Sequence, residues 1–536
     1  MNNKTFIYLI LAVIALISIS CDTTPRKRKV IICATTDIHG RYFDSLYVGG
    51  RTNQTSLANV STYIKQLREN GDNPVLIDVG DNLQGDNAAY FFNYVHNNEE
   101  HLFSKITKYL KYDALVVGNH DIETGHDVYD KFRKEVKIPY MAANAIITEG
   151  QDKGRPYFDP YTIVRRNGLK IAVIGMTNPC IKSWLSPSLW SGMEFGTLTS
   201  VAQKVTDMVI AKEKPDIVVM AVHSGIGDGS ESNFENSGKL LASQIRGVDL
   251  ILCGHDHHAA AKEVDNPNGN VVVLDAGSKC VVVAQCEISV ERKNGEISSK
   301  SISYRLVPMS DIPIDKDYTK TFKREYNLVK NFTNRVIGYL ADDLYFSDAQ
   351  DGPSSYLNLI HTVQMSTSGA EISFAAPLTK SGKIDKGSVT YQDLFTIYPF
   401  ENQLYVINLT GSQIKNYLEY SYDCWINKIG PSFNYDSAAG IIYTVSKSAE
   451  KGNRVTIVSM ENGDTFDLSK TYKVAINSYR ASGAGGLLTI GAGVDADNLD
   501  DITIHNLPEI RELLSDYIVK HKEIYLITST NWKFVE

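Results

Sequence analysis

The sequence is poor in cysteine, has no excess of positive charge and contains no apolar run long enough to span a bilayer. Seven cysteines in 536 residues are too few for a scaffold built on disulfide bonds. A net charge of −8 argues against sequence-independent binding of nucleic acid, which requires a basic face on the protein. It does not argue against a small anionic ligand, because bound metal ions can reverse the local charge. The chain is also 43% hydrophobic and 22% charged, which excludes a disordered protein.

The N-terminus has the layout of a secretory signal. Residues 6–20 carry no charge, but a membrane-spanning helix needs roughly 20 apolar residues. Lys4 precedes the run, and small residues lead to Cys21. The cysteine after small residues resembles a bacterial lipobox, which implies that Cys21 is lipidated. A signal anchor is the alternative reading, favoured by the basic residues 26–29. We therefore predict a signal peptide over residues 1–20 and an exported protein of the cell envelope, anchored to a membrane through Cys21 or periplasmic.

Short, continuous apolar runs alternate with amphipathic segments after Val30. The runs cover residues 30–35, 74–80, 113–119, 170–176, 216–223 and 248–255, and helices are predicted over 57–69 and 201–214. Continuous apolar strands indicate burial on both faces, so this part of the chain is predicted to be a layered α/β body. Residues 271–276 and 281–290 are predicted to form a later sheet. Cys33 and Cys253 lie in apolar runs and are predicted to be buried thiols.

The pattern changes near residue 317. Apolar residues recur at helical spacing from Asp317 to Asp343, which predicts one long amphipathic helix. A new α+β pattern begins near residue 340 and continues to the end. The predicted organisation is a first domain over 30–312, a linker helix over 313–338 and a second domain over 339–536.

Five motifs made of metal-ligating residue types follow predicted strands. They are Asp37-Ile38-His39, Gly80-Asp81, Gly118-Asn119-His120-Asp121, Val222-His223-Ser224-Gly225 and Gly254-His255-Asp256-His257-His258. In open α/β sheets, ligands bind at the carboxyl ends of the strands. One such motif is a weak signal, whereas five in one chain predict a metal site.

The residue types suit a pair of divalent metal ions. Two such ions about 4 Å apart can clamp a phosphate and activate a water molecule. A carboxylate can bridge both ions, and Asp81 is the predicted bridge. Asn119 can ligate through its amide oxygen without adding charge. Imidazoles suit several divalent ions alike, so the metal identity stays open. His120, beside a ligand, is predicted to protonate or stabilise the leaving oxygen, and Asp121 to fix its orientation.

In this order the motifs resemble those of the calcineurin-like metallophosphoesterases, and within them the bacterial 5′-nucleotidase and 2′,3′-cyclic-nucleotide 2′-phosphodiesterase group. The resemblance implies a four-layer sandwich, with two sheets flanked by helices, followed by an α+β nucleotide-binding C-terminal domain. It implies two divalent metal ions, such as Zn, Mn or Fe. The implied ligands of the first are Asp37, His39, Asp81 and His257, and those of the second are Asp81, Asn119, His223 and His255. His120 and Asp121 resemble the catalytic dyad, whereas Asp256 and His258 match no ligand position.

The second domain resembles the nucleoside-binding domain of the same family over residues 389–411. By position, Tyr435 and Tyr479 resemble an aromatic pair that stacks on the nucleobase. Phe433 is the alternative partner to Tyr435. Arg480 is a candidate contact to phosphate or ribose, with a surface salt bridge as the alternative. Since the metals and the tyrosines belong to different domains, we expect an interdomain cleft and a hinge near residues 335–345.

One departure from the family pattern favours one group of enzymes within the family over the others. The 5′-nucleotidases carry an NGG-type stretch with an arginine where this chain reads Phe374-Ala375-Ala376-Pro377-Leu378. The resemblance therefore favours an exported 2′,3′-cyclic-nucleotide 2′-phosphodiesterase/3′-nucleotidase that acts on small nucleotides. The alternatives are a 5′-nucleotidase or UDP-sugar hydrolase and, from another class, a nucleotide-binding surface lipoprotein without turnover. We expect no duplex nucleic acid and no obligate protein as a partner.

Overall fold

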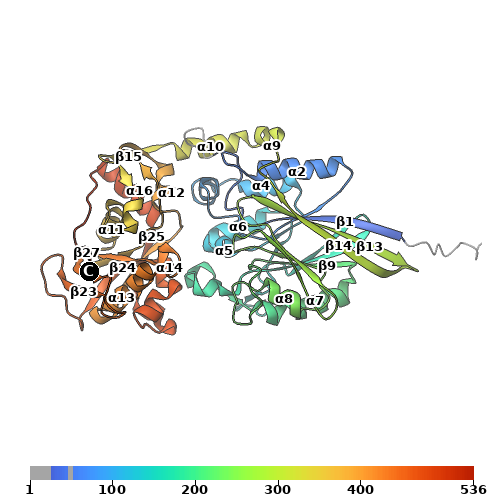
Figure 1. The fold of residues 1–536 in the computed structure, drawn as a ribbon. Coiled ribbons are helices and arrows are strands. Elements are labelled where there is room, and N and C mark those ends of the chain that lie inside the picture. The colour runs from blue at the N-terminus through green and yellow to red at the C-terminus, as the bar shows by residue number, and fades with distance from the viewer. Residues whose placement is uncertain (1–25, 46, 48–51) are drawn as a thin grey trace, which may run out of the picture.

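The computed structural model describes residues 26–45, 47 and 52–536. The predicted signal peptide and Cys21 lie outside the described residues. The chain forms two bodies that lie side by side, joined by α9 (Lys316–Thr321) and α10 (Lys323–Thr333) at the top of Figure 1. Within the described ranges, no helix combines the length and apolar character that a membrane span requires.

The first domain contains two six-stranded sheets. The first has the order β14 (Glu296–Pro308), β13 (Val282–Lys293), β1 (Arg26–Thr35), β2 (Val75–Asp78), β3 (Ala114–Val116) and β4 (Tyr140–Met141). The second has the order β11 (Ala260–Val264), β12 (Val271–Asp275), β10 (Leu250–Cys253), β9 (Ile217–Val222), β7 (Leu169–Met176) and β6 (Tyr161–Arg166). The strands β1 to β4 pair in parallel, as do β7, β9, β10 and β12. Parallel pairing places their carboxyl ends at one edge of each sheet.

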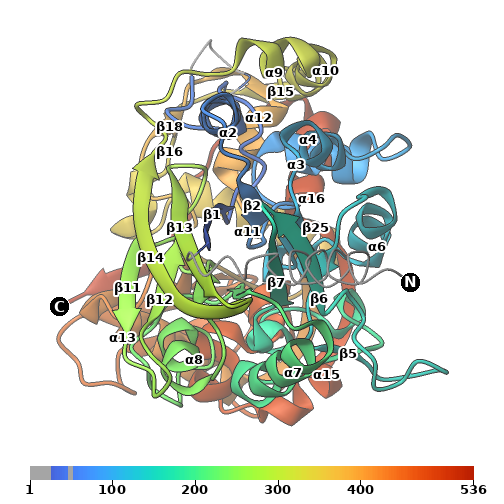
Figure 2. The same ribbon diagram turned by 90° about the vertical axis from the view of Figure 1, so that its right-hand side faces the viewer.

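The two sheets face each other and helices cover their outer faces. Because side chains alternate along a strand, Val30 and Ile32 of β1 point into the core between the sheets, while Ile31 and Cys33 point to the helical side. The helices on that side include α2 (Leu57–Glu69), α4 (Leu102–Leu110) and α6 (His126–Glu135), and α7 (Leu198–Glu213) and α8 (Gly238–Gln244) cover the second sheet (Figure 2). The result is the predicted four-layer sandwich.

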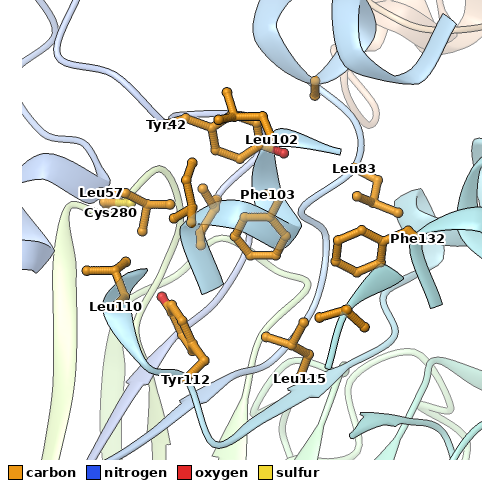
Figure 3. Close-up of a cluster of buried hydrophobic side chains, with 14 of the residues drawn as sticks. Tyr42, Leu57, Leu83, Leu102, Phe103, Leu110, Tyr112, Leu115, Phe132 and Cys280 are labelled. Atoms are coloured by element: carbon orange, nitrogen blue, oxygen red, sulfur yellow. The ribbon is translucent and has the colours of Figure 1, made fainter. Parts of the chain in front are cut away.

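The outer core beneath α4 is rich in aromatic side chains. Phe103 of α4 stacks on Phe132 of α6, with ring centroids 5.8 Å apart, and Tyr42 stacks on the other side of Phe103 at 5.6 Å (Figure 3). Leu115 of β3 closes the cluster from the sheet. Buried aromatic contacts of this kind fix the loops that follow β1 and β2, because Tyr42 also donates a hydrogen bond to the carbonyl of Asn82.

Two expectations differ from the structure. The predicted single linker helix is two helices, because the backbone at Phe322 leaves the helical conformation, and strand β15 (Val336–Leu340) follows directly. The predicted later sheet does not exist as a separate unit in the described chain. Instead β12 extends the second sheet and β13 pairs with β1 along nearly its whole length. The described cysteines are all free, and Cys33 and Cys253 are buried as predicted.

The second domain is α+β. Its main sheet has the order β21 (Ser437–Ala439), β17 (Ile372–Ala375), β24 (Thr471–Asn477), β20 (Gln403–Thr410) and β25 (Thr503–Glu509). One core lies beneath α11 (Ser355–Ser368), α12 (Tyr391–Ile397) and α16 (Ile510–His521), and another beneath α13 (Gly411–Asn427). The smaller sheets are β19 (Gly387–Thr390) with β15 and β26 (Glu523–Ile524), β23 (Val455–Met460) with β22 (Ile441–Ser446) and β27 (Trp532–Val535), and β16 (Leu344–Tyr345) with β18 (Lys383–Ile384).

Candidate metal centre

Loops at the carboxyl ends of five strands bring the predicted ligands together. The loop after β1 carries Asp37 and His39, and the loop after β2 carries Asp81. Helix α5 (Asn119–Glu123) begins directly after β3, while His223 follows β9. The loop after β10 carries His255 and His257. The ligands therefore come from both sheets and meet where the two sheet edges face each other.

The backbone of these loops is unusual. Five of the ligand residues have positive φ angles, namely Asp37 (48°), His39 (48°), Asp81 (59°), His255 (87°) and His257 (60°). Residues with side chains seldom adopt this conformation, and it concentrates at functional sites. The loops also approach each other closely, because a Cβ atom on Gly118 would collide with the Asp81 carboxylate. The positive φ angles and the close contact between the loops together place the ligand side chains near one another.

Three ligands form a first cluster. The ligand atoms of Asp37, His39 and His257 all lie within 4.8 Å of one another. Nε2 of His39 is 2.9 Å from Nε2 of His257, and Nε2 of His257 is 3.4 Å from Oδ1 of Asp37. The geometry suits one cation held by two imidazoles and a carboxylate.

A second cluster lies beside the first. Asp81, His223 and His255 also have ligand atoms within 4.8 Å of one another. The amide oxygen of Asn119 completes this set, at 3.1 Å from Nε2 of His223 and 2.9 Å from Nδ1 of His255. Oδ2 of Asp81 lies 3.1 Å from Nε2 of His223 and 3.9 Å from Nε2 of His39 in the first cluster. Asp81 is the carboxylate that faces both clusters, as the sequence predicted for a bridge.

In three of the four ligand imidazoles, the nitrogen that points away from the cluster is held by the protein. Nδ1 of His39 lies 3.1 Å from the carbonyl of Gln84, and Nδ1 of His223 lies 2.7 Å from that of Val79. A proton on Nδ1 leaves Nε2 free to ligate. His255 is reversed, since its Nε2 lies 2.9 Å from Glu235 and its Nδ1 faces Asn119.

The charge distribution fits two cations. Oδ1 of Asp37 and Oδ2 of Asp81 are buried and have no hydrogen-bond partner. A buried carboxylate oxygen without a partner is strongly unfavourable unless a cation neutralises it. Burial alone would lower the pKa of His223, but the charges of Asp81 and Asp37 raise that pKa to about 10. Burial lowers the pKa of His39 to about 4.

His120 lies beside the clusters and Glu123, rather than Asp121, is its carboxylate partner. Nδ1 of His120 contacts Oε2 of Glu123, one turn along α5. Burial would lower the pKa of His120, but Glu123 and Asp81 raise it to about 10, so the imidazole carries a proton at neutral pH. The main-chain N–H of His120 also donates to Asp81 over 2.8 Å. The sequence reasoning missed Glu123, although its i, i+3 spacing from His120 on a helix is a readable signal.

Asp121 has a structural role. Its carboxylate accepts hydrogen bonds from the main-chain N–H groups of Gly118 (2.8 Å), Asp81 (3.1 Å), Asn82 (2.8 Å) and Leu83 (2.9 Å). It therefore fixes the loop after β2 to the start of α5, and it does not orient His120.

The aromatic pair in the second domain is Phe433 and Tyr479. Both line a cavity of about 190 Å³ with His120 and Glu123. Their ring centroids lie 6.1 Å apart at an interplanar angle of 88°. Tyr435 is elsewhere: its ring stacks on Trp425 in the core at 5.9 Å, and its hydroxyl donates to the carbonyl of Gly430. Phe433, the alternative partner, therefore lies at this cavity with Tyr479, and Tyr435 does not.

Arg480 is buried and does not face the cleft. Its guanidinium donates to both carboxylate oxygens of Asp436, at 2.8 and 3.1 Å, and to the side chain of Asn434 at 2.9 Å. It also donates to the carbonyl of Phe433. Because these bonds use the guanidinium fully, Arg480 is not available to phosphate or ribose, and neither is it a surface salt bridge. Its effect is to fix the turn that presents Phe433.

A cavity of about 300 Å³ extends between the domains beside the second cluster. Trp184, which the sequence reasoning also missed, lies in its wall and stacks on the ring of His255 at 5.2 Å. The opposite wall includes Tyr479, Glu401 and Glu509 of the second domain. The metal clusters and the aromatic pair therefore open onto one interdomain cleft.

Two family models match the chain, the calcineurin-like phosphoesterase over residues 31–259 and the 5′-nucleotidase C-terminal domain over 336–491. The trifunctional nucleotide phosphoesterase protein YfkN of Bacillus subtilis is 24% identical over 94% of this chain, which spans only 38% of that protein. The 2′,3′-cyclic-nucleotide 2′-phosphodiesterase/3′-nucleotidase of Yersinia enterocolitica is 24% identical, with 98% of this chain and 90% of the relative covered. The structure of a candidate 5′-nucleotidase of Staphylococcus aureus matches with a TM-score of 0.79 at 22% identity, covering 95% of this chain and 100% of that one.

Proposed function

Because the chain belongs to the calcineurin-like phosphoesterases that carry a 5′-nucleotidase C-terminal domain, which are metal-dependent hydrolases, we propose that it hydrolyses nucleotides as a 2′,3′-cyclic-nucleotide 2′-phosphodiesterase/3′-nucleotidase. Calcineurin-like phosphoesterases use a dinuclear metal centre, and the two adjoining ligand clusters support the same arrangement here. Asp37, His39 and His257 would hold one ion, Asn119, His223 and His255 the other, and Asp81 both.

The observation that carries the proposal is the position of the aromatic pair. Phe433 and Tyr479 line the same cavity as His120 and Glu123, which adjoin the metal clusters. The two rings contact each other edge to face, so a nucleobase in this cavity would stack on the face of one of them and gain about 1–3 kcal/mol, since every base has a π-face. Its ribose would then lie toward His120, and its phosphate toward the metal clusters.

The protein side chains divide the chemistry between them. Two divalent ions, when bound, would neutralise the phosphate and lower the pKa of the attacking water. His120 would donate the proton on its ring to the leaving ribose oxygen, as a general acid. Glu123 holds Nδ1 of His120, so Nε2 is the nitrogen left to donate. Trp184 and Glu235 hold the ring of His255 in place.

Four substrates test the proposal. We expect the full chain, reconstituted with Mn²⁺ or Zn²⁺, to hydrolyse 2′,3′-cyclic AMP and 3′-AMP faster than 5′-AMP and a UDP-sugar. The reverse preference would contradict this branch and support a 5′-nucleotidase or UDP-sugar hydrolase. Tight nucleotide binding without turnover of any of the four would indicate a binding protein. The variant His120→Ala should lose at least a hundredfold in kcat, which a general acid contributes.

Export and anchoring form a separate part of the proposal, supported by the sequence of residues 1–21 alone. Cys21 would carry a lipid that holds the protein at a membrane of the cell envelope. In a bacterial host, metabolic labelling with a fatty acid should mark the full chain and not the Cys21→Ala variant, and fractionation should move that variant out of the membrane. Equal labelling of both proteins would contradict the anchor.

A further inference from the structure

A second cavity beside the metal centre is lined by positive charge. Its volume is about 410 Å³, and His39 and His257 of the first cluster form part of its wall. Arg41 and Lys279 line the same cavity. Neither residue belongs to the ligand set, and the catalytic proposal above does not use them.

The two cations are not matched by nearby carboxylates. Asp86 is the only acidic residue among the described residues that line this cavity. Its Oδ2 lies 3.9 Å from Nε of Arg41, while its Oδ1 accepts the main-chain N–H of Asn87 at the start of α3 (Asn87–Tyr90). Nε of Arg41 is buried and has no hydrogen-bond partner. The cavity thus holds an excess of positive charge and a guanidinium N–H without an acceptor.

The cavity on the other side of His120 has the opposite character. Glu123, Glu235, Glu401 and Glu509 line the cavity beside the second cluster, and no lysine or arginine does so in the part of the chain that the structure describes. Burial raises the pKa of Glu401 well above its usual range and that of Glu509 to about 7, so Glu123 and Glu235 are the groups that would repel a further anionic group on a substrate there. Of the two cavities, the one lined by Arg41 and Lys279 has the positive charge that would attract a further anionic group.

Short loops tie both cations to the ligands. Arg41 lies two residues after His39, and the loop packs against Gly85 and Asp86, whose main-chain N–H donates to the carbonyl of His39 over 2.8 Å. The main-chain N–H of Lys279 donates to the carbonyl of Asp37 over 2.8 Å. The cations are therefore held at a fixed place relative to the first cluster.

The same cavity communicates with the aromatic one. His120 and Phe400 line both. The second domain contributes Phe395, Pro399 and Phe400, which are apolar, and Gln392, which is polar. A nucleoside held by Phe433 and Tyr479 can thus extend one substituent to the metal clusters and another into the positive cavity.

We propose that Arg41 and Lys279 bind a second, non-scissile phosphate group, so that this protein prefers nucleotides with two phosphate groups over the matching monophosphates. The inference rests on the proposed nucleotide hydrolysis. It identifies nucleoside 3′,5′-bisphosphates as the substrate class when the second phosphate is on the ribose, and nucleoside diphosphates when it is on the first phosphate. Paired guanidinium and ammonium groups are the usual protein ligands of phosphate.

Paired substrates test the preference. We measure kcat/KM of the metal-loaded full chain for 3′-AMP against adenosine 3′,5′-bisphosphate and for 5′-AMP against ADP. For each pair, the value of kcat/KM for the substrate with two phosphate groups is divided by the value for the monophosphate. The pair with the larger ratio identifies which second phosphate is bound. In the double variant Arg41→Gln/Lys279→Gln this ratio should fall at least tenfold, through KM, because the loss of one charge-assisted bond alone accounts for about that much. The exposed cations Arg246 and Lys262 line none of these cavities, and their double glutamine variant is the matched control.

The outcomes separate this inference from the proposed function. A ratio near one in the unmodified protein, or an equal loss on mono- and bisphosphate in the double variant, would overturn it, since the second result places the cations on the scissile phosphate. If no nucleotide is hydrolysed, the proposed function fails, and calorimetry with inorganic pyrophosphate and phosphate still tests the cation pair. Pyrophosphate should bind about tenfold more tightly than phosphate, and the double variant should lose the difference. Equal affinities would overturn the inference.

Discussion

The two acidic residues after His120 should separate catalysis from stability. Asp121 and Glu123 lie two positions apart on α5, yet their carboxylates have different partners. Glu123 contacts only the imidazole of His120 among the described hydrogen bonds, whereas Asp121 accepts four main-chain N–H groups. We therefore expect Glu123→Gln to lower kcat with little effect on stability, and Asp121→Asn to do the reverse.

The magnitudes follow from these contacts. In Asp121→Asn one oxygen becomes an NH₂ group, so two of the four buried N–H groups face a donor. Each buried group left unsatisfied costs about 1–3 kcal/mol, which gives about 4 kcal/mol in total. In a domain of this size that loss lowers Tm by about 10 °C. In Glu123→Gln the charge that orients His120 and retains its proton is lost. Removing such a partner commonly reduces activity about 10–100-fold.

The assay compares the loss of kcat with the loss of Tm in the two variants. For each variant, kcat on 3′-AMP and Tm by calorimetry are measured at the same metal concentration, with Glu149→Gln at an exposed position of the first domain as a control. The reasoning is refuted if Asp121→Asn loses more kcat than Glu123→Gln while keeping its Tm. That result would restore Asp121 as the partner of His120 and would mean that the loop after β2 does not depend on it.

Three further predictions concern the metal, the base and the pH. Asp81→Asn should lose most of both bound metal ions by elemental analysis, because Asp81 faces both clusters, whereas Asp256→Asn, in the motif that follows β10, should keep them. Phe433→Ala should raise KM for nucleotides about tenfold without a large change in Tm, and Tyr435→Ala should lower Tm, since its ring is in the core. Burial raises the folded-state pKa of Glu509 from 4.5 to about 7, so its contribution to stability is present below pH 4.5 and lost as the pH rises through 7. Lowering the pH from 8 to 5 should therefore raise the contribution of Glu509 to stability by about 2 kcal/mol, and the change in stability with pH should differ between the unmodified protein and Glu509→Gln by about that amount.

The ligand set could be predicted because it depends on strand ends. Each buried parallel strand of the first domain appears in the sequence as an apolar run, and the residues at the end of the run must lie at the carboxyl end of that strand. Asp37, Asp81, Asn119 and His223 follow this rule directly. The same runs predict a layered α/β body, since strands buried on both faces need cover on each side, whereas the four layers are what the family resemblance implies. What the runs do not specify is strand order, and so β12 and β13 were assigned to a sheet that does not exist.

The residues around the substrate were harder to predict because neighbours in sequence point to different environments. Phe433 and Tyr435 lie two positions apart, but a short 3₁₀ turn over Ser432–Asn434 sends one ring to the cleft and the other to the core. Tyr479 and Arg480 are adjacent on one helical turn, and only Tyr479 faces the cleft. At such positions the direction of a side chain depends on the tertiary contacts, which composition and spacing do not contain.

The strained backbone at the ligands bears on how the metal centre forms. Five positive φ angles at about 1 kcal/mol or more each store roughly 5–10 kcal/mol, and Asp and His tolerate this conformation better than most residues. The loops keep it through bonds that involve no metal, because the N–H groups of Asp37 and His39 donate to the carbonyls of Gly80 and Asp81. These main-chain bonds between the two loops therefore help to hold the conformation in which the ligand side chains face each other. It follows that Gly118, whose missing Cβ lets Asp81 reach both clusters, contributes to metal affinity as a ligand does, although it donates no ligand atom.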